Sequence, residues 1–396
     1  MPPTPIDILQ TIPSPVFKWP LEFCAFSTVT TYILSILTGN VSQVDRVWTF
    51  LPVIYSAYFA LLPLWPRQAA STIPYVPIIP YIPENISQDL VNGFTPRALL
   101  MLGLCVIWMF RLSYNTFRRG LFSLTDEDYR WAVLRKQLHP IIFQIFNLTF
   151  VAATQNALLL LLGLPTCIAA TRQAHTPLAP SDFILAIAAL VVLATEFTAD
   201  NQQYSFQSFK HSILPKTAPQ EATSGEGRRV REGSGHGDIV EYNKDAQWPG
   251  ARINWTLDDA KRGFVTRGLW AYSRHPNFAC EQTFWWIITI FPLIAPYPPS
   301  LPSTGVFIRE LMDKPSLAAF TPFAPLIPAF ALSALFFSST IFTESISQSK
   351  YPVAYAAYKE RVGMFGFVRT WEKGRALGNR KAEVEKLVWG APKKSE

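Results

Sequence analysis

The stretch Arg267-Gly-Leu-Trp-Ala-Tyr-Ser-Arg-His-Pro-Asn-Phe-Ala-Cys-Glu281 places Arg274 and His275 directly before a proline and then leads into the apolar segment 284–294. Proline has no amide hydrogen and suits the first turn of a helix, so we expect Pro276 to begin a membrane helix. The N-terminus of a helix offers free backbone donors that attract anions such as phosphate. Two interpretations remain open here, an anion site or a basic anchor in the lipid headgroup layer.

The composition of the 396-residue chain is that of an integral membrane protein, with 49% apolar and only 16% charged residues. Its net charge is +7, but the basic residues lie in loops between apolar runs, which argues against nucleic acid as a partner. The four cysteines lie far apart, and no two histidines have the spacing of metal ligands. We therefore expect no metal site.

Seven segments approach the roughly 20 residues that a helix needs to cross a bilayer. They are approximately 21–38, 47–65, 97–114, 139–164, 182–199, 278–296 and 320–343. The sequence thus predicts an all-α, polytopic membrane helical bundle with about seven transmembrane helices.

The chain is expected to divide into three parts. An N-terminal region, 1–95, holds two of the predicted transmembrane helices, and a membrane domain, 96–372, follows it. That domain contains a flexible cytoplasmic insertion at 216–250, which is rich in Gly, Ser and charge. A polar C-terminal tail, 373–396, ends the chain.

Lysine and arginine gather in alternate loops. They are frequent between the third and fourth segments and throughout 200–277, but scarce in the loop with Arg172 and in 297–319. Because positive charge favours the cytoplasmic side, the two basic loops and the C-terminal tail are expected to be cytoplasmic, and the N-terminus luminal.

Two polar clusters follow apolar segments on that cytoplasmic side. After the third segment, Arg111, Asn115 and Arg118 share one helical face. At the end of the fifth segment, Glu196 and Asp200 lie four residues apart. An ionisable group at the end of an apolar helix needs a partner. Each cluster also has a plainer interpretation. The first would be a basic membrane anchor, and the second would be a helix that leaves the bilayer.

A third cluster joins the 267–281 stretch to the residues that follow the last segment, Glu344 first among them. Tyr351, Tyr355 and Tyr358 share one helical face, and Arg361 extends it. Such a face could stack on an adenine ring and neutralise phosphates, although an interfacial aromatic belt would have the same pattern.

These segments resemble a known membrane family. Gly268-Leu-Trp-Ala-Tyr-Ser-Arg-His-Pro-Asn277 with Glu281, Ala199-Asp-Asn-Gln202 with Phe206, and Tyr355-Ala-Ala-Tyr-Lys-Glu-Arg361 are similar to the DUF1295 group, which is related to the C-terminal domain of steroid 5-alpha-reductases. Arg111-Leu-Ser-Tyr-Asn-Thr-Phe-Arg-Arg-Gly120 and Glu127-Asp-Tyr-Arg-Trp131 match the same group, so the resemblance spans roughly 100–370. The Arg-His-Pro core is shared with sterol reductases and with isoprenylcysteine carboxyl and phospholipid methyltransferases.

The resemblance implies NADPH as the cofactor and, as the reaction, reduction of a carbon–carbon double bond in a sterol, steroid or other lipid enone. The implied cofactor-binding residues are Asp200, Gln202, Phe206, Lys210, Trp270, Tyr272, Ser273, Arg274, His275, Asn277, Glu281, Tyr355, Tyr358 and Arg361. Hydride transfer to an enone leaves negative charge on the carbonyl oxygen, so an acid is needed nearby. The catalytic candidates are Tyr272, Glu281 and, on an earlier helix, Tyr114.

We expect an integral, multi-pass protein of the endoplasmic reticulum whose cofactor site faces the cytoplasm. Its partners would be the lipid bilayer and a hydrophobic lipid substrate, with the oligomeric state left open. Two other functions remain: a lipid or isoprenylcysteine methyltransferase that uses S-adenosylmethionine, and a non-catalytic membrane scaffold of the same fold. The reductase interpretation requires the three clusters to converge into one cationic pocket.

Overall fold

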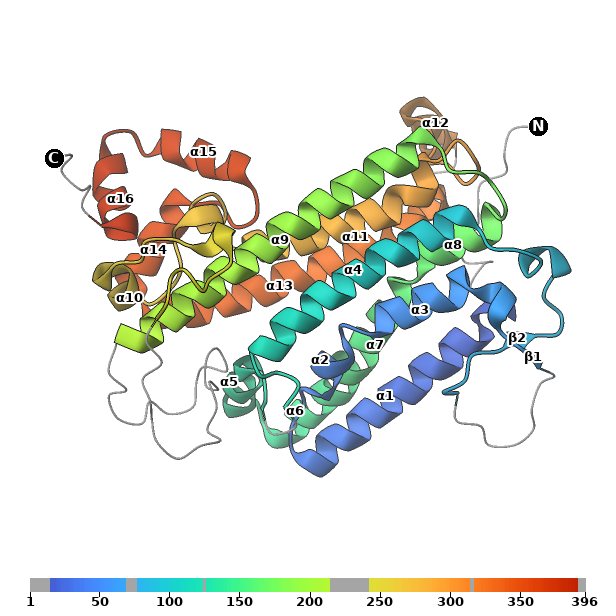
Figure 1. The fold of residues 1–396 in the computed structure, drawn as a ribbon, viewed down its shortest axis with the longest axis horizontal. Coiled ribbons are helices and arrows are strands. Elements are labelled where there is room, and N and C mark those ends of the chain that lie inside the picture. The colour runs from blue at the N-terminus through green and yellow to red at the C-terminus, as the bar shows by residue number, and fades with distance from the viewer. Residues whose placement is uncertain (1–14, 69–76, 124–125, 214–241, 314–316, 391–396) are drawn as a thin grey trace. The chain divides into compact units, whose positions relative to one another are not determined.

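The computed structural model describes residues 15–68, 77–123, 126–213, 242–313 and 317–390 (Figure 1). Over these residues the chain is mostly helical, and β1 (Arg67–Gln68) and β2 (Ile82–Pro83) form a small parallel pair. The prediction of an all-α helical bundle is confirmed. The part of the predicted insertion from 216 to 241 lies outside the described residues.

The chain forms two compact units, which are described separately. The first comprises Met1–Leu190 and Trp285–Ser333, and the second Val191–Phe284 and Ala334–Glu396. The boundaries between them fall within α9 (Pro180–Ile213), α11 (Pro276–Ile294) and α13 (Ile327–Lys350).

The first unit contains most of the helices. They are α1 (Lys18–Thr38), α2 (Gln43–Val47), α3 (Leu51–Ala60), α4 (Pro96–Arg118), α5 (Tyr129–Gln137), α6 (Pro140–Phe146), a π-helix (Asn147–Thr154), α7 (Gln155–Leu161), α8 (Leu164–Arg172) and α12 (Thr304–Asp313). Its core includes the indoles of Trp108 and Trp285, which pack edge to face with ring centroids 5.0 Å apart. A buried ion pair between Arg97 and Asp182 joins the starts of α4 and α9.

Proline begins many of these helices. Pro96, Pro140, Pro180 and Pro276 are the first residues of α4, α6, α9 and α11, because a first-turn residue needs no amide hydrogen and proline already has a helical φ. The predicted helix start at Pro276 is therefore confirmed.

Five helical stretches within the described residues are long and apolar enough to cross a membrane. They are Pro15–Thr38, Pro96–Arg118, Pro140–Arg172, Pro180–Ile213 and Phe320–Lys350. Each coincides with one of the seven predicted segments, so the protein is a multi-pass integral membrane protein.

The other two predicted segments form helices that are shorter or less apolar. In segment 47–65, α3 has only 10 residues, which at 1.5 Å per residue is about half of a ~30 Å hydrocarbon layer. In segment 278–296, α11 has 19 residues, but Asn277, Glu281 and Gln282 reduce the apolar character of its first turns.

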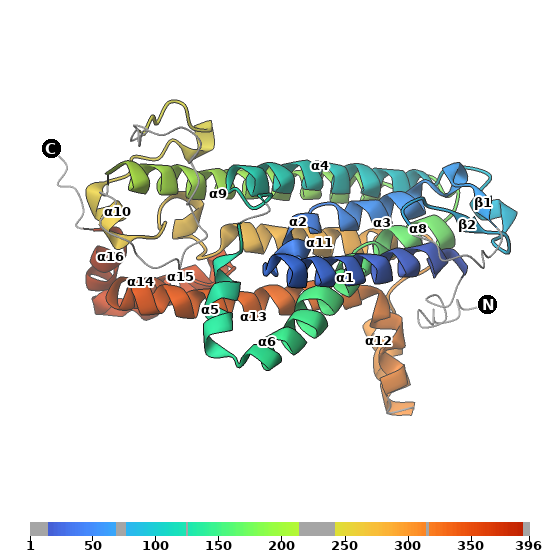
Figure 2. The same ribbon diagram turned by 90° about the horizontal axis from the view of Figure 1, so that it is seen from below.

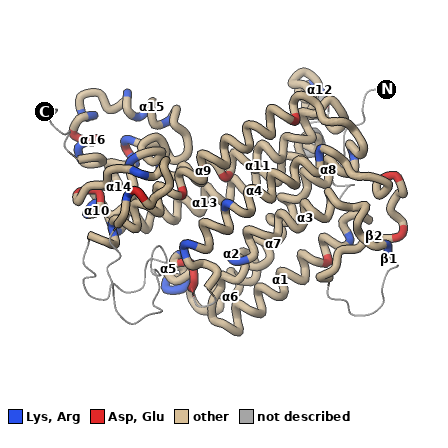
Figure 3. The backbone as a smooth tube through the Cα atoms, in the orientation of Figure 1, with Lys and Arg blue, Asp and Glu red and all other residues tan. Residues whose placement is uncertain are grey.

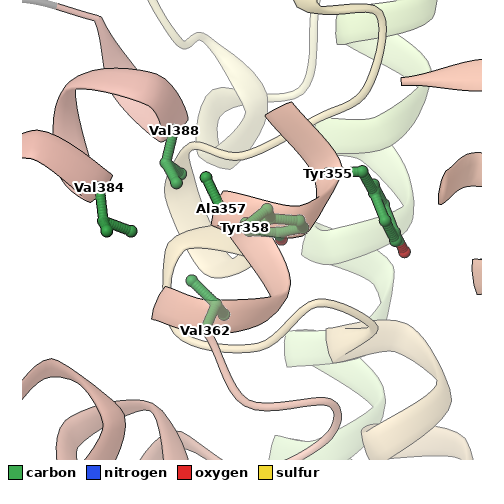
Figure 4. Close-up of a cluster of buried hydrophobic side chains, with 6 residues drawn as sticks. All are labelled: Tyr355, Ala357, Tyr358, Val362, Val384 and Val388. Carbon is green, nitrogen blue, oxygen red and sulfur yellow. The ribbon is translucent and has the colours of Figure 1, made fainter. Parts of the chain in front are cut away.

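The second unit gathers short helices around the C-terminal ends of α9 and α13 and the start of α11. They are α10 (Leu257–Arg262), α14 (Pro352–Arg361), α15 (Phe367–Ala376) and α16 (Lys381–Trp389), and Figures 1 and 2 both show α14 to α16 gathered together. Between α14 and α16 lies an apolar core that includes Tyr358, Val362, Val384 and Val388 (Figure 4). Residues 377–389 thus contribute to the packing of this unit.

Candidate functional site

The residues before α11 are fixed by the loop that follows α14. The backbone amides of Arg274 and His275 donate to the carbonyl oxygens of Gly363 and Met364, at 2.9 and 3.1 Å. The Ser273 hydroxyl also donates to the Met364 carbonyl, at 3.0 Å. Two amides that the sequence suggested as anion donors are therefore engaged by the protein's own carbonyls.

The Arg274 side chain is buried and forms a two-pronged ion pair. Its Nε and Nη2 donate to Oε1 and Oε2 of Glu344, at 2.6 and 3.1 Å. Its Nη1 donates to the carbonyls of Lys359 and Val362. Bidentate pairing of this kind fixes both the position and the plane of the guanidinium.

Glu344 has further basic neighbours, although it is only 2% exposed. The Nε2 atom of His275 lies 3.0 Å from its Oε1, and the ammonium of Lys359 lies 3.6 Å from its Oε2. We refer to Arg274, His275, Glu344 and Lys359 as the Glu344 cluster. One carboxylate here faces three basic groups, and a buried charge persists only where such partners are present.

Lys373 on α15 adds another positive charge beside this cluster. Its ammonium donates to the Lys359 carbonyl at 2.5 Å, the same oxygen that Arg274 Nη1 approaches at 3.4 Å. Burial, and then repulsion by Arg274 and Arg369, lowers the pKa of Lys373. Positive charge around α14 and α15 therefore exceeds the nearby carboxylates, a condition that favours an anionic ligand.

The end of α9 is joined to the start of α11 by polar side chains. The Asn277 amide donates to Asp200 Oδ1 at 3.2 Å. Gln202 donates to the Gly250 carbonyl and accepts from the Leu269 amide, both at 2.9 Å. Two of the three predicted clusters thus meet within the second unit.

Gly268 makes the close approach to Gln202 possible. Its φ is +67°, a left-handed conformation that side chains disfavour, and a Cβ atom there would lie 2.5 Å from the Gln202 amide oxygen. Beyond this turn, the Trp270 indole donates to the Ala199 carbonyl at 3.2 Å, and the Tyr358 hydroxyl donates to the Trp270 carbonyl at 2.6 Å.

The predicted aromatic and basic residues mostly contact the protein itself. Tyr355 and Tyr358 pack against Phe264, with ring centroids 5.0 and 5.4 Å from it. Phe206 packs edge to face on Trp255 in a second buried cluster, at 5.2 Å. These rings form cores between helices.

Two further cationic candidates, Lys210 and Arg361, bond to other groups of the second unit. Lys210 donates to the Gly263 carbonyl at 3.1 Å, and Arg361 forms an ion pair with Glu385 on α16 at 2.8 Å. Among the candidates for catalysis in this unit, Glu281 is buried, whereas Tyr272 is 61% exposed. Tyr272 is therefore the candidate most accessible to a ligand.

The remaining predicted cluster belongs to the first unit. There Arg118 donates to Asn115 Oδ1, at 2.9 Å from Nη2, and its guanidinium lies 5.1 Å from the ring centroid of Tyr114. Tyr114 is 51% exposed. The expected convergence of all three clusters thus remains a prediction, while the two in the second unit are in contact.

Comparison with known proteins places the chain in a family. Residues 85–298, more than half of the chain, match the model of the DUF1295 family, described as a protein of unknown function. The chain belongs to the DUF1295 family. This family is related to steroid 5-alpha-reductase-like proteins.

A relative of this DUF1295 protein is the uncharacterized protein C594.04c of Schizosaccharomyces pombe. The two are 28% identical over 333 residues, which cover 84% of this chain and 74% of the yeast protein. No solved structure matches the chain.

Four residues at the centre of this DUF1295 site were given no binding or catalytic role from the sequence: Glu344 and Lys359, which belong to the third cluster after the last segment, and Thr370 and Lys373. The sequence does contain a signal for Glu344, because it is the one acidic residue within α13, whose final turns are otherwise apolar or neutral until Lys350. Thr370 accepts from the Gly363 amide at 2.7 Å and donates to the Tyr272 carbonyl at 2.6 Å. Nothing in the sequence pattern indicates that pairing.

Proposed function

We propose that this DUF1295 protein is a membrane-embedded, NADPH-dependent reductase of a carbon–carbon double bond in a sterol, steroid or other lipid enone. The observation that carries the proposal is the meeting of motif residues in the second unit. Asp200 and Gln202 come from α9, Arg274 and Asn277 from the start of α11, and Tyr358 from α14. In addition, the basic residues that surround Glu344 suit a ligand rich in phosphate.

The residues present fit NADPH by their chemistry. Phosphates need cations, and Arg274, Lys359 and Lys373 together outnumber the Glu344 carboxylate. Ribose hydroxyls and a carboxamide need donors and acceptors, which the side chains of Asp200, Gln202 and Asn277 possess. NADPH, when bound, supplies the hydride.

Within this proposal the cofactor is held by the implied residues of the second unit, and the chain itself contributes orientation and a proton. Glu344 keeps Arg274 and His275 in fixed positions, so that these side chains need no rearrangement when a ligand arrives. The exposed phenol of Tyr272 is the preferred proton donor, with Glu281 and Tyr114 as the other candidates. The hydrophobic substrate enters from the bilayer of the endoplasmic reticulum, and the cofactor site faces the cytoplasm.

Equilibrium binding of NADPH and of S-adenosylmethionine to the detergent-purified full chain tests this function. Because Tyr272 is 61% exposed, Tyr272→Ala should leave the fold intact and weaken NADPH binding about tenfold, the effect of losing one hydrogen bond. Val353→Ala is a matched control, since Val353 on α14 is 67% exposed and belongs to none of the motifs. Its NADPH affinity should equal that of the parent chain.

Two other outcomes would replace the reductase. Binding of S-adenosylmethionine without any NADPH response would indicate a lipid or isoprenylcysteine methyltransferase. Binding of neither would indicate a non-catalytic membrane scaffold. One observation favours the scaffold as the second candidate: Arg274, Tyr358 and Arg361 all bond to groups of the protein itself.

A further inference from the structure

Helix α15 presents a large apolar surface. Phe367, Val368 and Trp371 are 68%, 54% and 58% exposed. Because they lie one and four residues apart, their side chains project from one side of the helix. Three large apolar side chains gathered on one short helix indicate a contact surface, whereas isolated exposed apolar residues need no explanation.

Positive charge borders this apolar side. The Arg375 guanidinium lies 4.6 Å from the centroid of the Trp371 ring, and the Arg369 side chain is 70% exposed. Lys373 is the third basic residue of α15, and Glu372 is its one acidic residue. Figure 3 shows lysine and arginine along α14 to α16.

The adjacent side of α15 packs against the rest of the second unit. Thr370 and Gly374 are buried, and Thr370 bonds to both Gly363 and Tyr272. A Cβ atom on Gly374 would lie 2.9 Å from Nη1 of Arg361, so any larger residue there would displace the Arg361 guanidinium. The exposed apolar side therefore has a fixed orientation.

We propose that α15 lies in the headgroup layer of the membrane that the chain spans. In this position Phe367, Val368 and Trp371 reach the ends of the acyl chains, and Arg369 and Arg375 pair with the phosphates of anionic lipids. A short amphipathic helix with aromatic residues beside basic ones has the composition of an interfacial helix. Its place in the chain agrees, because α15 begins 17 residues after the apolar span ends at Lys350.

This position has a consequence for the Glu344 cluster. Lys373 belongs to α15 and bonds to Lys359, and Thr370 bonds to the backbone of Tyr272. A lipid-bound α15 thus holds the candidate site at the membrane surface, where a lipid-soluble substrate is available. The lipid contact itself does not depend on the proposed reductase activity.

Spin labels on the full chain in lipid nanodiscs test the proposal. Val368→Cys places a label on the apolar side, and Ala376→Cys, also exposed, is the control because it lies about 80° further round the helix, toward Arg369. The parent chain without an introduced cysteine supplies the background signal from Cys24 and Cys280. The label at 368 should be more accessible to oxygen than to a water-soluble nickel complex, and the label at 376 should show the reverse.

Lipid composition tests the role of the basic residues. Replacing part of the phosphatidylcholine with phosphatidylserine should lower nickel access at 368 by about fivefold, the factor expected for one basic residue near an anionic surface. Changing Arg369→Gln together with Arg375→Gln should remove this response. If nickel access at 368 does not change with lipid composition in the Val368→Cys chain that retains Arg369 and Arg375, the headgroup pairing is overturned.

Two results at position 368 would overturn the proposal as a whole. A label that is as open to nickel as the one at 376 would place α15 in water. A label that is immobile, closed to both reagents and broadened by a second label would show that another copy of the chain covers this surface.

Discussion

The two units each bury an arginine–carboxylate pair, and the two pairs differ in their charge balance. In the first unit, Arg97 bonds to Asp182 through two contacts of 2.8 Å, and both side chains are fully buried. The remaining donors of Arg97 are satisfied by neutral groups of Gln173, Thr176 and Pro177. One positive charge meets one negative charge, so this pair is a structural link between helices.

In the second unit, a single carboxylate serves several basic groups. Glu344 contacts Arg274, His275 and Lys359, and Lys373 lies beside them. A surplus of positive charge next to buried groups destabilises the fold unless an anion balances it. The comparison teaches that burial of an ion pair alone does not indicate a site. A surplus of positive charge around the pair does, when one of the basic groups is accessible, as Lys359 is with 43% of its side chain exposed.

The largest expected effect concerns the balanced pair. Arg97→Ala leaves the Asp182 carboxylate buried without its partner, which should lower the free energy of unfolding by about 3–5 kcal/mol. Thermal unfolding of the detergent-purified protein measures this. As the matched variant, Arg97→Met combined with Asp182→Leu should recover most of the loss, because both charges are then absent. If the double variant does not recover stability, the neutral contacts of Arg97 contribute more to the free energy of unfolding than its charge does.

A smaller effect is expected at the unbalanced cluster. Glu344→Gln keeps the shape of the side chain but removes its charge, and should cost about 2–3 kcal/mol. Inorganic pyrophosphate should then raise the unfolding temperature of this variant more than that of the parent chain, because the cationic groups have lost their carboxylate. Asp182→Asn is the control and should show no pyrophosphate response, since its site is closed to solvent. If pyrophosphate raised the unfolding temperatures of Glu344→Gln and Asp182→Asn equally, the two ion pairs would not differ in their charge balance.

The smallest expected effect concerns a carboxylate of the second unit that is well supplied with partners. Burial alone would raise the pKa of Asp259, but hydrogen bonds from Arg267 and Thr256 bring the pKa below its usual range. A carboxyl with a lowered folded pKa stabilises the fold above the unfolded value of about 3.9, and this stabilisation is lost as pH falls through the folded pKa.

Asp259→Asn should flatten that part of the stability profile and cost about 1–2 kcal/mol at neutral pH, because Arg267 and Thr256 then donate to a neutral amide instead of a carboxylate. Unfolding curves recorded between neutral and acidic pH measure both changes. Asp258→Asn, at an exposed position of the same helix, should behave as the parent chain does. An unchanged acid profile in Asp259→Asn would show that other carboxylates determine it.

Local chemistry made part of this structure predictable. Pro276 begins α11 because a first-turn residue needs no amide hydrogen. Asp200 and Gln202 meet the 268–277 stretch because polar groups at the end of an apolar helix need partners. The short α3 was harder to foresee, since an apolar run does not reveal that it breaks at Leu61 into a turn with Pro63.

The partners of a helical face could not be predicted from spacing. Tyr355 and Tyr358 share a face, as expected, but this face packs against Phe264 and residues of the C-terminal helix α16 instead of standing open. Likewise, the sequence places Arg274 at a helix start but does not tell which distant carboxylate will meet it. Glu344 is 70 residues away along the chain, and pairing over such a separation depends on tertiary packing.

Equilibrium binding of NADPH to the full chain in nanodiscs, with NADH and S-adenosylmethionine as comparison ligands, tests the central claim most directly. The surplus of positive charge around Glu344 predicts saturable NADPH binding that is tighter than NADH binding, because the additional phosphate meets those cations. Equal affinity for NADPH and NADH, or no binding of either, would contradict the account.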